Sequence, residues 1–232
     1  MSSGRGELVE GPLSRVATVA YWFLVVEVLL ALTTAPALVV ALFLDRSPGN
    51  VALFALCAVP LGPAVSAALF AWRRFLRERD TSPAAHFWRG YRLNVLDALR
   101  TWVPALVVLA VLATNTAYAG LSSAAGVPVP VFVVLAGVLL LWTVRVLAIT
   151  SAFAFRWRDA ARIAAYTITA RPLATLGLLS LLVLTAGIAA FTFDAVVVLL
   201  ASVLTFLVAR NERPVLAMVE ERFVEGRTEP AP

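Results

Sequence analysis

The stretch CAVPLGPAVSAALFAWRRFLRERDTSPAAHFWRGYRLNVLDALRTW, from Cys57 to Trp102, decides the fold class. An apolar run ends at Trp72, an arginine-dense segment follows, and a second apolar run begins near Thr101. Apolar helices remain in lipid, while arginines collect where a chain leaves it on the cytoplasmic side. This pattern therefore indicates a junction between membrane and cytoplasm.

The composition supports the same class. Hydrophobic residues make up 61% of the 232 residues, against about 45–50% in soluble globular chains. The chain contains neither a GxxxxGK[ST] loop nor a GxGxxG motif, and its single cysteine, Cys57, cannot form an intramolecular disulfide. The single histidine, His86, lies in a polar segment without paired carboxylates. We expect no enzymatic activity, no catalytic residues, no cofactor and no metal site.

Six segments approach the roughly 20 apolar residues that a membrane-spanning helix needs. We therefore predict an all-α, polytopic transmembrane helical bundle over residues 17–209, between a tail at 1–16 and a tail at 210–232. The first segment contains Pro36, which predicts a kink or break near Thr33. The last is short, so five spans with a re-entrant or buried hairpin is the alternative. The predicted spans are 17–44, 51–72, 101–120, 129–151, 173–193 and 195–209.

The arginines predict the orientation, because cytoplasmic segments retain them during insertion. All 19 basic residues are arginine, and seventeen of them fall in the tails or in the segments after the second and fourth spans. Only Arg46 falls on the opposite side, and Arg145 lies within a span. We expect a multi-pass protein of the bacterial cytoplasmic membrane with both termini cytoplasmic. Since the net charge of +5 sits at helix ends, we expect the lipid bilayer, and no nucleic acid, as a partner.

Two of the predicted cytoplasmic segments have the periodicity of amphipathic helices. Placing residues 87–102 at 100° intervals collects aromatic and aliphatic side chains on one side and polar ones on the other. Residues 155–172 repeat the pattern more weakly. Such helices lie at the headgroup boundary or under the bundle, with arginines toward anionic lipid or a partner. The side chains predicted to form this face are Arg89, Arg92, Asn94, Arg100, Arg158 and Arg162.

Two ionisable residues, Glu27 and Arg145, fall inside predicted spans, where charge is costly and becomes a functional hypothesis. The interpretation we favour is a structural bridge between them within the bundle. A neutral or solvated Glu27 with an Arg145 that extends to the headgroups is the first alternative. A proton or substrate path is the second.

The second predicted span carries two proline residues, Pro60 and Pro63, on either side of Gly62. We expect a helix break there, with the freed carbonyl groups covered by protein or by a wet cavity. A structural kink is the main interpretation, and a transporter binding site is the alternative. Residues 64–71 place small alanines on one face, which predicts close helix packing.

These motifs resemble the YesL-like family of bacterial integral membrane proteins, in its actinobacterial branch. The residues that carry the resemblance are Pro60, Gly62 to Ala64, Ala67 to Leu69, Tyr91, Arg92 and Asn94. The chain departs from the family at Pro60 and Leu61, where a threonine often precedes the IGPA run, and in its longer 45–50 connection.

The resemblance supplies no catalytic residues. It implies association with carbohydrate uptake by ABC-type transport systems, so we expect an accessory or scaffold component that contacts transporter subunits or itself. The alternative is a small-solute or proton-coupled permease that uses the broken second span and Glu27.

Overall fold

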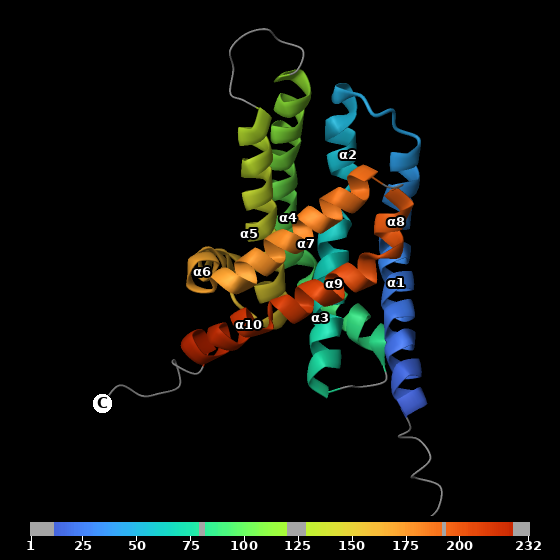
Figure 1. The fold of residues 1–232 in the computed structure, drawn as a ribbon, viewed down its shortest axis with the longest axis vertical. Coiled ribbons are helices and arrows are strands. Elements are labelled where there is room, and N and C mark those ends of the chain that lie inside the picture. Colours follow the sequence, from blue (N-terminus) through green and yellow to red (C-terminus); the bar gives the residue numbers. More distant parts are fainter. Residues whose placement is uncertain (1–11, 79–81, 120–128, 192–193, 225–232) are drawn as a thin grey trace, which may run out of the picture.

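The computed structural model describes residues 12–78, 82–119, 129–191 and 194–224. Every element within these ranges is helical, which confirms the predicted all-α helical bundle (Figure 1). The elements are α1 (Pro12–Leu42), η2 (Pro48–Asn50), α2 (Val51–Cys57), α3 (Leu61–Glu78), α4 (Pro83–Ala119), α5 (Val129–Ala152), α6 (Trp157–Ala170), α7 (Pro172–Phe191), α8 (Asp194–Leu199), α9 (Ala201–Asn211), α10 (Arg213–Val219) and the short π-helical turn η3 (Glu220–Val224).

Within the described residues, four helices are long and apolar enough to cross a membrane: α1, α4, α5 and α7. The pair of Pro48–Cys57 and Leu61–Arg77, bent by 41°, is a fifth candidate. The sixth predicted span, 195–209, is two shorter helices, α8 and α9, separated at Leu200. The described residues thus contain four candidate spans, or five with the bent pair, against the six expected.

The predicted amphipathic helix at 87–102 is not a separate loop helix. It forms the first half of α4, which continues through Pro104 into the apolar residues that follow. The reason is local: a proline close to the middle removes one donor but does not end a helix whose neighbours pack against it. The second predicted amphipathic helix, by contrast, is a separate element, α6.

Helix α1 also continues across its proline. The predicted break near Thr33 is absent, since Pro36 lies inside one helix that ends at Leu42. The hydroxyl groups of Thr33 and Thr34 donate to the carbonyl groups of Leu29 and Leu30 at 2.8 and 2.7 Å, so both threonine side chains are satisfied inside the apolar helix.

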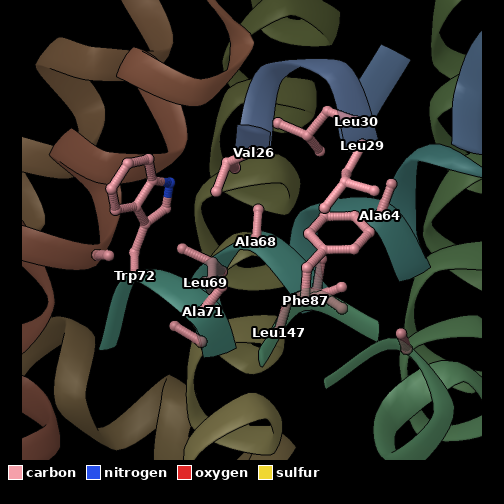
Figure 2. Close-up of a cluster of buried hydrophobic side chains, with 14 of the residues drawn as sticks. Val26, Leu29, Leu30, Ala64, Ala68, Leu69, Ala71, Trp72, Phe87 and Leu147 are labelled. Atoms are coloured by element: carbon pink, nitrogen blue, oxygen red, sulfur yellow. The ribbon is translucent and has the colours of Figure 1, made fainter. Parts of the chain in front are cut away.

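Helix α3 forms the centre of the bundle and contacts α1, α4, α5 and α9. Its alanines, among them Ala64 and Ala68, are fully buried against Val26, Leu29 and Phe87 of α1 and α4 (Figure 2). Small side chains allow the helix backbones to approach closely where lipid offers no hydrophobic driving force between helices. The predicted small-residue packing face therefore lies in the core.

A second buried cluster packs α6 against α5 and α10. It joins Val146 and Ile149 of α5 to Ile163 of α6 and to Val215 and Val219 of α10. The segment 210–224 is therefore helical and packed, although we expected a tail there.

Figure 1 places the arginine-rich parts of the chain at one end of the bundle. The lower half of the view holds the C-terminal end of α3, the N-terminal end of α4, and helices α6 and α10. The α1–α2 connection and the facing ends of α4 and α5 lie at the top, while α7 and α9 cross the long helices obliquely.

Candidate functional site

A fully buried ion pair joins Arg145 in the middle of α5 to Glu212, between α9 and α10. The guanidinium donates from Nε to Oε2 of Glu212 at 3.1 Å and from Nη2 to Oε1 at 3.0 Å. Both side chains are 0% exposed. The two parallel bonds match the planar fork of arginine to a carboxylate, which is the geometry that best offsets the cost of removing both charges from water.

The third guanidinium nitrogen of Arg145, Nη1, also has a hydrogen-bond partner. Its Nη1 donates to the hydroxyl oxygen of Thr175 on α7 at 2.8 Å, and this hydroxyl donates to the carbonyl of Ile168 at 2.9 Å. All three guanidinium nitrogens therefore have partners, so the network fixes α5, α7 and the α9–α10 junction relative to one another.

Asn211 extends the network to the backbone of α7. Its Nδ2 donates to the carbonyl of Ala174 at 2.8 Å and to Oε1 of Glu212 at 3.3 Å. Gly177 makes this possible, because a Cβ at that position would overlap Oδ1 of Asn211. Asn211 and Glu212 thus act as a pair at the helix junction.

Glu27 does not pair with Arg145, so the expected bridge between them is wrong. Its Oε2 accepts a hydrogen bond at 2.7 Å from the backbone N–H of Ser202, in the first turn of α9. The carboxylate occupies the position of a helix cap, where the orphan N–H groups and the positive end of the helix dipole stabilise negative charge. Its Oε1 is buried and has no hydrogen-bond partner among the residues that the structure describes.

Sequence reasoning missed Glu212 because it assigned residues 210–232 to a tail. The available signal was the run Asn211–Glu212 directly at the end of an apolar segment and before Pro214, where a helix junction is expected.

The predicted helix break is confirmed, since α2 ends at Cys57 and α3 begins at Leu61. The indole Nε1 of Trp102 donates to the carbonyl of Ala58 at 2.8 Å. Gly62 lies directly against the same indole, where a Cβ would overlap it. The break lies at residues 58–60 and includes Pro60, whereas Gly62 and Pro63 fall in the first turn of α3; protein covers a carbonyl at this break, as a structural kink requires.

The predicted arginine face divides into separate surfaces. Arg89 and Arg92 line one groove of about 560 Å³ with Trp88 and Leu93 on α4. Arg100 and Arg158 meet in a second groove of about 440 Å³ between α4 and the α5–α6 connection. Arg162 is exposed on α6 and lines neither groove, and Asn94 is half-buried, with its Nδ2 unpartnered.

The chain's single histidine and single cysteine lie apart from this network. The ring of His86 lies 6.2 Å from that of Trp22, within the aromatic packing of α1 and α4. Cys57 is a free thiol at the end of α2. Among the residues that the structure describes, no three His, Cys, Asp or Glu side chains are grouped in a way that could hold a metal ion.

Comparisons with known proteins address the N-terminal half of the chain. No curated protein and no solved structure matches the chain. Residues 16–116, which include α1 to α3 and most of α4, match the family described as "Protein of unknown function, DUF624", a family that includes the YesL-like proteins.

Proposed function

We propose that this chain is a non-enzymatic, YesL-like membrane protein that acts as an accessory or scaffold component of carbohydrate uptake by an ABC-type transporter. The family match over residues 16–116 supports the family part of this proposal. The motif residues around Gly62 and Asn94 support the YesL-like part, and the association of that family with sugar uptake supports the role.

The observation that carries the proposal is the contrast between the paired side chain of Arg145 inside the bundle and exposed arginines at one end of it. Arg145 uses all its donor atoms within a structural network, and the break in the second span is covered by Trp102. Arg89 and Arg92, in contrast, are exposed beside the large apolar side chains of Trp88 and Leu93. A surface of this mixed character suits contact with another protein.

The length of α4 favours a protein partner over lipid at this surface. At 1.5 Å per residue, Arg92 and Arg89 lie about 12 and 17 Å along the helix from Arg100, where the apolar part begins. A headgroup layer is only about 5–8 Å deep. Measured along α4, both arginines therefore lie further from its apolar part than a headgroup layer is deep. We place this end in the cytoplasm, with both termini there, because it holds most of the arginines.

The test is complementation of a chromosomal deletion in the host bacterium, with uptake of labelled sugars as the measurement. We expect the deletion to lower uptake of at least one sugar and the wild-type chain to restore it. The double variant Arg89→Gln/Arg92→Gln should reach normal amounts in the membrane yet fail to restore uptake. Normal uptake in the deletion strain with every sugar, or full rescue by the double variant, would contradict the proposal.

Photo-crosslinking identifies the partner directly. A benzophenone maleimide attached to Leu93→Cys, in a Cys57→Ala background, should capture a permease subunit of an ABC transporter. The same probe at Val40→Cys, an exposed position of α1 at the opposite end of the bundle, is the matched control. Capture of only a second copy of the chain from position 93 would replace the transporter partner with self-association.

A second candidate, a permease that uses Glu27, is favoured by one observation: the buried Oε1 of this carboxylate has no hydrogen-bond partner. Glu27→Gln separates the two functions, because an amide oxygen still accepts from the N–H of Ser202 but the side chain cannot carry a proton. An accessory protein predicts full rescue by this variant, whereas a proton-coupled permease predicts loss of flux with normal insertion.

A further inference from the structure

The second groove, between α4 and the α5–α6 connection, combines positive charge with apolar surface. It has a volume of about 440 Å³ and is lined by Asp97, Arg100 and residues 154–158. Arg156, Trp157 and Arg158 are exposed, and Phe155 is half-buried beside them. The groove is therefore open, with guanidinium groups next to aromatic rings.

The charges of this groove do not balance. Arg100 Nη1 lies 3.1 Å from Oδ1 of Asp97, so this arginine has an acidic partner. Arg156 and Arg158 form no ion pair with the residues that the structure describes, and the guanidinium of Arg158 lies 5.5 Å from the ring centroid of Trp157. Two unneutralised positive charges thus face the groove, which favours an anionic occupant.

The start of α6 adds backbone donors to the same place. The helix begins at Trp157, and its capping residue, Arg156, has an extended backbone and makes no side-chain hydrogen bond to the first turn. The N–H of Asp159 donates to the carbonyl of Arg156 at 2.9 Å, so the first turn offers the N–H groups of Trp157 and Arg158, and such groups bind phosphate oxygens well. They strengthen the preference for an anion that the two arginines already set.

Two helix lengths place the groove at the depth of lipid headgroups. The apolar part of α4, residues 101–119, measures about 28 Å at 1.5 Å per residue, close to the roughly 30 Å of a bilayer core. Arg100 directly precedes this part. The 24-residue α5 ends at Ala152, two residues before the groove begins, and at about 36 Å it reaches just past the core.

We propose that this groove binds the phosphate group of an anionic phospholipid, with Arg156 and Arg158 as the charged contacts. Trp157 and Phe155 then lie beside the glycerol backbone, in the interfacial layer that aromatic residues prefer. This site is independent of the proposed uptake role, because it uses neither Arg89 nor Arg92.

The test is a titration of the purified full-length chain, depleted of lipid in mild detergent, with phosphatidylglycerol. Bound lipid is counted by native mass spectrometry, and the thermal midpoint is followed in parallel. We expect saturable binding that raises the midpoint, and a weaker response to phosphatidylcholine. Arg156→Gln/Arg158→Gln should weaken the apparent affinity about tenfold to thirtyfold, as expected when two interfacial arginines are lost.

The control is Arg89→Gln/Arg92→Gln, which removes the same charge from the other groove and should bind phosphatidylglycerol normally. Equal weakening in both double variants, or equal binding of phosphatidylcholine, would overturn the site. Inorganic phosphate is the third arm: if it saturates the thermal shift and displaces the lipid, the ligand is a soluble phosphate. Should the double variant fail to accumulate, Arg158→Gln alone, on an exposed side chain, provides the same test.

Discussion

Two ion pairs of the same chemistry lie in opposite environments. Arg145 and Glu212 are both 0% exposed and lie 3.0 Å apart, whereas Arg77 and Glu220, 2.7 Å apart, are 49% and 36% exposed. The shorter contact is the weaker one, because water and salt screen exposed charges and the two long side chains lose entropy when they meet. Environment, and not distance, decides which pair matters to the fold.

The buried pair also carries neighbours that the exposed pair lacks. Thr175 and Asn211 bond directly to its two members, so the loss of one side chain unpairs the other buried charge and also removes a hydrogen bond to Thr175 or Asn211. An unpaired charge in a low-dielectric interior costs far more than the pair itself contributes.

The largest effect is expected from breaking the buried pair. Arg145→Met or Glu212→Leu alone leaves an unpaired buried charge and should destabilise the chain by about 3–5 kcal/mol. We expect both single variants to accumulate poorly in the membrane and to unfold at lower temperature in mild detergent.

The double variant Arg145→Met/Glu212→Leu sharpens the interpretation. It removes both charges, so it should be more stable than the sum of the two single losses implies. Additive losses would show that the pair does not act as a unit and would remove the contrast with the exposed pair.

A smaller loss is expected where a glycine makes room for the buried network. In Gly177→Ala the new methyl group would overlap Asn211, which should cost about 1–3 kcal/mol as Asn211 moves away from Glu212. Gly187→Ala is the matched control on the same helix, since nothing lies within 4 Å of a Cβ there. The measurement is the thermal midpoint of each variant, and equal midpoints would contradict the tight fit at Gly177.

A third test concerns the hydrogen bond from Trp102 to a carbonyl at the break in the second span. Trp102→Phe keeps an aromatic ring but removes one of two donors to the Ala58 carbonyl, which also accepts from the N–H of Leu61 at 3.1 Å, so the expected cost is that of one hydrogen bond, about 0.5–1.5 kcal/mol. We expect a lower thermal midpoint. Trp88→Phe is the control, because Trp88 is an exposed residue of the same helix. A Trp102→Phe variant as stable as its control would show that the hydrogen bond from the indole does not stabilise the break.

Local signals in the sequence explain what could be predicted. Long apolar runs indicated the helical bundle, and the Pro–Leu–Gly–Pro run ending at Pro63 located the break between α2 and α3. These features depend on residues that are neighbours in sequence. The alanine face of α3 was equally readable, because its spacing follows the helical period.

The partner of Arg145 could not be predicted from the sequence, because it is not a neighbour of Arg145 in the chain. Glu212 lies 67 residues away, on a segment whose packing depends on the way α7 and α9 cross the bundle. Glu27, with the same chemistry and a position inside a predicted span, was chosen instead, yet one of its oxygens accepts from a backbone N–H at the start of α9. Pairing of distant charges follows from tertiary contacts that composition and periodicity do not encode.

The continuity of α4 was missed because its first half is charged and its second half apolar. Such a change of composition marks where a helix crosses the headgroup level, and it need not mark the end of the helix. The face formed by Arg89 and Arg92 remains a prediction that the uptake and cross-linking experiments test.

The smallest effect is expected at the exposed ion pair. Arg77→Gln and Glu220→Gln should each change the free energy of unfolding by no more than about 1 kcal/mol, because water solvates whichever charge remains. A double-mutant cycle, measured by thermal unfolding at low and high salt, should give a coupling energy that shrinks toward zero as salt rises. A coupling as large as that of Arg145 with Glu212, and insensitive to salt, would mean that lipid or a partner buries this pair in the membrane.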